Sequence, residues 1–181
     1  YPIVIYRRMM EYKIERIKVD CSEFLSKYQN VEKFLPMCRS CHNFGKVYTC
    51  PPFGDEIYSV LKNYRSLELF VMRVDASQMI GYEQARDYFD KEMLNLEREN
   101  GGSLAFFAGS CTICGKGNCS REKGEECRYK ELSRLSLEAV GIDVTSALSD
   151  YFGVELEWAS ESETPSTIHL LSALAVDKFV V

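Results

Sequence analysis

The chain has 181 residues, of which 46% are hydrophobic and 27% are charged. This length supports a domain with its own core, and the composition is that of a globular protein rather than a disordered one. The formal net charge of −5 argues against a nucleic-acid partner, because such a partner favours a basic surface.

The hydrophobic pattern predicts strands that alternate with helices. From the N-terminus, the expected elements are a strand (11–20), a helix (22–35), a helix that begins at Asp55, a strand (67–75), a long helix (82–100), a strand (103–110), two short helices (132–141 and 143–153), an edge strand (154–158) and a central strand (167–176). Pro36 is expected to end the first helix, and Asp143 and Gly153 bound the last one. The sequence therefore predicts one layered domain over residues 1–181, of the α/β or α+β class, with helices packed on a sheet of about five strands.

The sequence contains no apolar run near the roughly 20 residues that a membrane helix needs. The chain starts at Tyr1, and its first apolar stretch is too short, with basic residues on the wrong side, for a signal peptide. We therefore expect a cytoplasmic protein with no membrane span.

Eight cysteines are the unusual feature of the composition. A disulfide framework is the first alternative, but such frameworks belong mainly to small secreted chains that lack a core. In a cytoplasmic chain of this size, cysteines that bind metal are the better hypothesis.

The second cysteine motif is the more complete one. It has the spacing C-x2-C-x4-C-x7-C and comprises Cys111, Cys114, Cys119 and Cys127. Four soft thiolate donors in one short loop indicate zinc or an iron–sulfur cluster. A single C-x2-C followed by two separate cysteines is closer to a ferredoxin-type loop than to the paired C-x2-C of zinc ribbons. Two disulfides or buried thiols are the alternative.

The first motif has three cysteines, Cys38, Cys41 and Cys50, in the pattern C-x2-C-x8-C-P-P. A proline directly after the last cysteine also occurs in bacterial ferredoxin motifs. A four-ligand site would need one more donor, for which Cys21 is a candidate and His42 a weaker one. Without that donor, three cysteines would hold a [4Fe–4S] cluster with one open iron, able to act as a Lewis acid.

Other polar residues lie near the second motif. Ser136 and Glu138 are expected to cap or line the short helix that follows it. A basic patch surrounds the motif and could offset thiolate charge or receive an anionic partner, although a solvated face is the simplest interpretation. The patch consists of Arg121, Lys123, Arg128 and Arg134.

Together, the stretches "CRSCHNFGKVYTCPPFG", "CTICG" and "CRYKELSRLSLEAVGIDV" resemble an uncharacterised bacterial and archaeal family described as predicted metal-binding proteins. The resemblance extends from Cys38 to about Val144. It implies a metal-binding protein with iron–sulfur character, whose ligands are the seven cysteines of the two motifs. It implies no role for Cys21 or His42, and no reaction.

Two functional hypotheses follow. In the first, the chain carries one or two [4Fe–4S] clusters and serves in electron transfer or as a reductase component, with a redox protein or a small molecule as its partner. An enzyme of this kind would be an iron–sulfur oxidoreductase or lyase acting at the Cys38/Cys41/Cys50 site. In the second, both motifs bind zinc in a structural or interaction module without catalysis.

Overall fold

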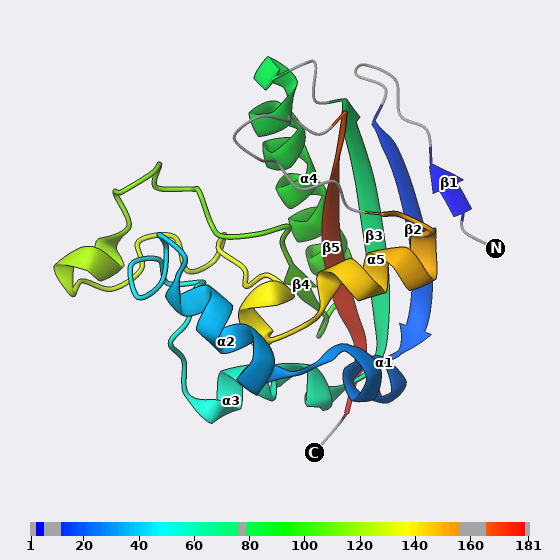
Figure 1. The fold of residues 1–181 in the computed structure, drawn as a ribbon, viewed down its shortest axis with the longest axis horizontal. Coiled ribbons are helices and arrows are strands. Elements are labelled where there is room, and N and C mark those ends of the chain that lie inside the picture. The colour runs from blue at the N-terminus through cyan, green and yellow to red at the C-terminus, as the bar shows by residue number, and fades with distance from the viewer. Residues whose placement is uncertain (1–2, 6–11, 76–78, 156–165, 180–181) are drawn as a thin grey trace.

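The computed structural model describes residues 3–5, 12–75, 79–155 and 166–179 (Figure 1). At its centre lies a five-stranded sheet with the order β1-β2-β3-β5-β4, and all four pairings are antiparallel. The strands are β1 (Ile3–Ile5), β2 (Lys13–Asp20), β3 (Tyr64–Asp75), β4 (Leu104–Phe106) and β5 (Thr167–Lys178). The predicted mixed class and the sheet of about five strands are confirmed, and β5 has the central position expected for it.

Helices cover both faces of this sheet. The described helices are α1 (Cys21–Tyr28), α2 (Val31–Arg39), α3 (Asp55–Tyr58), α4 (Met79–Glu99) and α5 (Val144–Phe152), with shorter 3-10 turns η1 (Val60–Asn63), η2 (Ser120–Lys123) and η3 (Glu138–Val140). One core contains Leu67 and Leu69 of β3 with residues of α1 and α5. The other contains Phe70 and Met72 of β3 with Phe89 of α4. Because β3 is buried on both faces, its sequence is nearly continuously apolar.

The single helix predicted over 22–35 is wrong. The chain forms two helices there: α1 ends at Tyr28, and Asn30 caps α2 by accepting from the Lys33 N–H at 2.9 Å. Pro36 does not end α2, which continues to Arg39. A proline removes only one helical hydrogen bond, and α2 extends only one further turn beyond it. Cys38 therefore lies in the last turn of a helix rather than in a loop.

Two further elements differ from the prediction. Residues 132–141 form turns and the three-residue η3 instead of a helix. The strand expected at 103–110 is limited to Leu104–Phe106, since the Phe107 N–H donates to the Leu135 carbonyl at 2.8 Å rather than to β5. The edge strand predicted over 154–158 is not formed at 154–155, and the rest of it lies outside the described residues.

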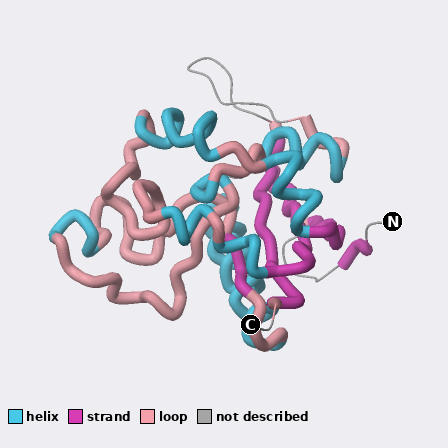
Figure 2. The backbone as a smooth tube through the Cα atoms, turned by 90° about the horizontal axis from the view of Figure 1, so that it is seen from below, coloured by secondary structure: helices cyan, strands magenta, loops and turns pink. Residues whose placement is uncertain are grey.

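The two cysteine segments lie together beyond one side of the sheet. Figure 2 shows loops gathered there, away from the strands. Within residues 41–54 and 109–137 the described backbone consists of turns and the short η2. Among the described residues, no helix has both the length and the apolar character needed to cross a membrane.

Candidate metal centre

The first cysteine segment is folded tightly on itself. The Cys41 N–H donates to the Cys38 carbonyl at 3.0 Å, and the Gly45 N–H donates to the Pro51 carbonyl at 2.8 Å. Gly45 has φ +70, a conformation that glycine adopts without strain. These bonds close the backbone of the segment that carries the three cysteines.

The thiols of this segment influence one another electrostatically. Burial, and then the charge of Cys41 and Cys38, raise the pKa of Cys50 to about 11. Burial and the charge of Cys41 also raise the pKa of Cys38. Three thiolates so placed repel one another, and a bound metal cation would offset that repulsion.

The second segment begins with a compact turn. The Gly115 N–H donates to the Thr112 carbonyl at 2.9 Å, and Gly115 has φ +79 directly after Cys114. Burial raises the pKa of Cys111, a backbone hydrogen bond from Ile113 lowers it, and the charges of the other three cysteines of the motif raise it. The four thiols are therefore electrostatic neighbours, as one binding site requires.

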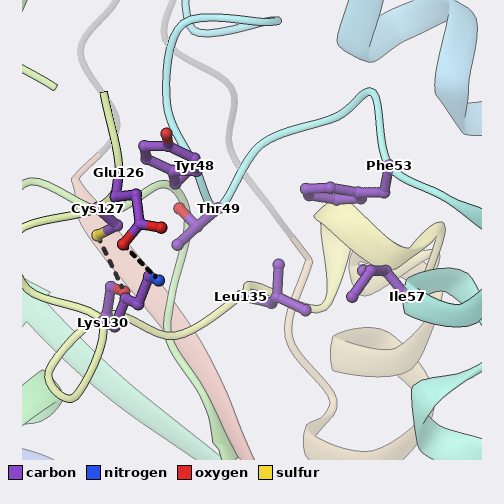
Figure 3. Close-up of a pocket in the computed structure, with 9 residues that line it drawn as sticks. Tyr48, Thr49, Phe53, Ile57, Glu126, Cys127, Lys130 and Leu135 are labelled. Carbon is purple, nitrogen blue, oxygen red and sulfur yellow. Dashed lines mark hydrogen bonds and ion pairs between the residues drawn. The ribbon is translucent and has the colours of Figure 1, made fainter. Parts of the chain in front are cut away.

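Two cavities separate the cysteine segments. The first, of about 290 Å³, is lined by Cys111, Cys114 and Cys119 of the second segment and by residues 42–43 and 46–47 of the first. The second, of about 480 Å³, is lined by Cys127 (Figure 3). Tyr48 and Thr49 lie near Cys127 there, whereas the far wall is apolar and formed by Phe53, Ile57 and Leu135.

The two segments are joined by Arg121, whose contacts we call the Arg121 clasp. Its guanidinium donates to the carbonyls of Val47 at 2.8 Å, Cys50 at 2.6 Å and Pro52 at 3.0 Å. The clasp thus fixes a residue between Cys119 and Cys127 to the backbone around Cys50.

Three other hydrogen bonds also join the first cysteine segment to the second. Asn43 Nδ2 donates to Ser110 Oγ at 2.9 Å, and the Cys111 N–H donates to the buried Thr49 Oγ1 at 3.1 Å. The Tyr48 hydroxyl also donates to the Glu125 carbonyl. The loops therefore form one interlocked unit.

Arg86 of α4 attaches this unit to the sheet. It is 9% exposed, and it donates to the carbonyls of Ser110 at 2.6 Å and Gly109 at 3.3 Å, directly before Cys111. Asp90 pairs with it, with 3.4 Å between Arg86 Nε and Asp90 Oδ2. Sequence analysis missed Arg86, although an arginine next to the apolar face Ala85–Phe89 was a signal for a buried role.

The basic patch divides in two. Arg121 is half-buried in its clasp, and Arg134 forms a largely buried ion pair with Glu97 of α4. Lys123 and Arg128 are exposed. The prediction of a solvent-exposed basic face is therefore wrong for Arg121 and Arg134 and confirmed for Lys123 and Arg128.

The two proposed fourth ligands lie in different surroundings. Cys21 is fully buried in the core, and its thiol donates to the Leu61 carbonyl at 3.3 Å. His42 is exposed and lines the 290 Å³ cavity beside the second motif.

The seven motif cysteines of the interlocked segments are free thiols, and this set of sulfur donors fits a thiophilic metal. Within residues 12–75, 79–155 and 166–179, no three Cys, His, Asp or Glu side chains lie close enough together to hold a metal ion. The thiols of each motif thus influence one another electrostatically, but they do not converge on a common metal position.

The two cysteine motifs lie within the part of the chain that matches a known protein family. The model of a family described as "Predicted metal-binding protein (DUF2284)" matches residues 21–174, a span that includes all eight cysteines. The chain belongs to this family of predicted metal-binding proteins. Comparisons with curated proteins and with solved structures gave no match. The family is one of predicted metal-binding proteins, and the comparison leaves the metal and the reaction to be inferred from the site.

Proposed function

We propose that this chain is a cytoplasmic iron–sulfur protein, in which Cys111, Cys114, Cys119 and Cys127 hold a [4Fe–4S] cluster. The observation that carries the proposal is the cavity of about 290 Å³ into which three of these cysteines open. A water molecule occupies about 30 Å³ of liquid volume, so the cavity has room for a group several times larger than one zinc ion. The spacing of one C-x2-C and two single cysteines supports the same choice.

We further propose that Cys38, Cys41 and Cys50 hold a second cluster. The charge of Cys111 contributes to the raised pKa of Cys50, so the two sites are electrostatic neighbours. Bound clusters would supply electron transfer at the four-cysteine site, and electron transfer or a Lewis-acidic iron at the three-cysteine site. The chain's contribution is to fix the two ligand loops against each other through the Arg121 clasp. An oxidoreductase or lyase activity at the three-cysteine site would use this arrangement.

A redox protein is the partner that the surface supports best. Five large apolar side chains are exposed among the described residues, and four of them lie within five residues of a motif cysteine. These are Met37, Ile113, Tyr129 and Leu132. Apolar side chains exposed around a metal site are typical of a protein-docking surface. A small-molecule partner would instead occupy the 480 Å³ cavity.

The test is metal and acid-labile sulfide analysis of protein purified without oxygen, together with its visible absorption spectrum. We expect a brown protein with iron and sulfide in equal amounts. Cys114→Ser is expected to lower both contents, while the matched variant Cys21→Ala leaves them unchanged, because Cys21 lies in the core. A colourless protein with stoichiometric zinc and no sulfide would refute the iron–sulfur proposal.

The second candidate is a structural zinc module. The compact turn over Cys111–Gly115 favours it, because a C-x2-C followed by glycine in a left-handed conformation can also wrap a single zinc ion. The same metal analysis separates the two candidates.

A further inference from the structure

The cavity of about 480 Å³ beside Cys127 has an apolar side and a polar side (Figure 3). Its volume lies within the range of roughly 300–1,000 Å³ that is usual for small-molecule sites. The apolar side consists of Phe53, Ile57 and Leu135, and each of these side chains is partly exposed. Ile57 and Leu135 also pack on the core, so the wall that they form is fixed in place. A ligand with an apolar body would remove this exposed surface from water.

The polar side of the cavity offers hydrogen-bond donors. Thr49 is only 6% exposed, and its Oγ1 atom accepts from the Cys111 N–H at 3.1 Å. The Thr49 O–H itself has no acceptor in the described part of the chain. Ser133 also lines the cavity, and its hydroxyl lies 3.8 Å from the Cys127 sulfur, which is a weak acceptor. A buried hydroxyl whose hydrogen is unused favours a ligand that carries an acceptor.

Lys130 makes the polar side suitable for an anion. Its ammonium pairs with Glu126 at 3.1 Å, but the two side chains are 62% and 88% exposed. An exposed pair of this kind contributes little to stability, so Lys130 can exchange Glu126 for a ligand at small cost. An ionised carboxylate only accepts hydrogen bonds, and its two oxygens can accept several at once. It therefore matches an ammonium and two hydroxyl donors in one cavity.

We propose that this cavity binds a small carboxylic acid with an apolar body. The carboxylate accepts from Lys130, Thr49 and Ser133, and the body lies against the apolar side. The inference rests on the proposed function for a small-molecule partner, but no metal enters the contacts of the ligand. Cys127 is the one motif cysteine that lines the cavity, so the bound acid lies beside the four-cysteine site. Residues of both cysteine segments line the cavity, and the acid therefore also joins the two segments.

The test is isothermal titration calorimetry of the full chain, purified without oxygen, with phenylacetate, phenylacetamide and acetate. The amide keeps the apolar body and lacks the charge, whereas acetate keeps the charge and lacks the body. We expect phenylacetate to bind, and each of the other two to bind at least about ten-fold more weakly. Equal binding of the amide or of acetate would overturn the inference, as would no binding of phenylacetate at millimolar concentration.

Three variants locate the binding site. Lys130→Gln should weaken phenylacetate binding at least about ten-fold and leave phenylacetamide binding unchanged. Glu126→Gln should strengthen phenylacetate binding, because it removes the anion that competes for Lys130. Weaker binding in Glu126→Gln would assign the cavity to a cationic or zwitterionic ligand and overturn the carboxylate. Lys91→Gln is the matched control, since Lys91 forms a similarly exposed pair with Asp87 on α4. It should bind phenylacetate as the parent chain does, and equal losses in the two lysine variants would refute the site.

Thermal unfolding checks that the variants remain folded. Because Lys130 is exposed, Lys130→Gln should melt at the parent temperature without ligand. A ligand of the folded chain raises its melting temperature, so phenylacetate should stabilise the parent chain more than this variant. Metal and sulfide analysis of the same samples keeps the two proposals apart. Zinc without sulfide in a chain that binds phenylacetate refutes the iron–sulfur proposal alone, whereas iron and sulfide in a chain that does not bind it refute the carboxylate site alone.

Discussion

Removing the Arg121 clasp is the sharpest perturbation that the structure offers. Arg121→Ala deletes three hydrogen bonds, of 2.8, 2.6 and 3.0 Å, that join the second cysteine segment to the first. Arg121→Lys keeps the charge, but a single ammonium cannot reproduce the planar fork that reaches three carbonyls. Both variants should therefore loosen the two segments, with alanine having the larger effect.

The expected magnitude follows from these contacts. A hydrogen bond that involves a charged group contributes roughly 1.5–3 kcal/mol to stability when it is well shielded. Arg121 is only half-buried, and the released carbonyls of Val47, Cys50 and Pro52 can bind water. We therefore expect Arg121→Ala to lower the unfolding free energy of the metal-free protein by about 2–3 kcal/mol in total. For a chain of this length that loss corresponds to a fall in melting temperature of roughly 5–10 °C.

The assay is thermal unfolding of reduced, metal-free protein, combined with hydrogen exchange of the backbone amides of residues 47–50. Arg128→Ala is the matched control, because the exposed Arg128 makes a single bond to the Asn118 carbonyl within its own segment. We expect little change in the control. Equal melting temperatures for the Arg121 and Arg128 variants, or unchanged exchange at residues 47–50, would refute the clasp.

Two further predictions concern the scaffold. Gly141→Ala should lower the unfolding free energy by about 1–3 kcal/mol, because its Cβ would lie 2.8 Å from Val31 Cγ2 at φ +82. Gly101→Ala, which meets no atom within 4 Å, should be neutral or slightly stabilising in the same denaturant titration, and equal losses would contradict the packing argument. Burial raises the pKa of Asp90 from 3.8 to about 6 against the opposing charge of Arg86. The protonated carboxyl therefore stabilises the fold below about pH 4, and this contribution, about 3 kcal/mol, is lost as the pH rises through 6. Asp90→Asn should remove that pH dependence, so parallel stability profiles of parent and variant between pH 4 and 7 would show that the shift is absent.

The regular elements could be predicted because their signals are local. The apolar run of β3, the helical spacing of Ala85, Phe89 and Met93 in α4, and the Asp143 cap of α5 all lie within single segments of sequence. The break between α1 and α2 is different. It depends on the bridge from Gln29 to Ile142, which only the folded chain brings together. A local pattern that continues across residues 22–35 could not reveal it.

The candidate site shows the same division. Spacing and residue type selected the seven motif cysteines, and their role as ligands stays a prediction. Spacing could not reveal Arg121 or Arg86, because both donate to backbone carbonyls, and every residue carries such an acceptor whatever its side chain. Glu138 was expected to cap or line a short helix near the second motif, and it instead begins the three-residue η3.

The way in which the loops are anchored bears on how metal binding would stabilise them. Arg86 of α4 donates to the Ser110 carbonyl at the start of the second segment. Arg121, further along the same segment, donates to the Cys50 carbonyl of the first segment. The first segment is anchored separately, through α2 and its contact with η3. Each segment is therefore fixed at one side by the scaffold and at the other by its partner loop. A ligand that binds only the folded state stabilises that state. Metal bound at either motif would therefore also stabilise the folded arrangement of the Arg121 clasp, and so favour metal binding at the other motif.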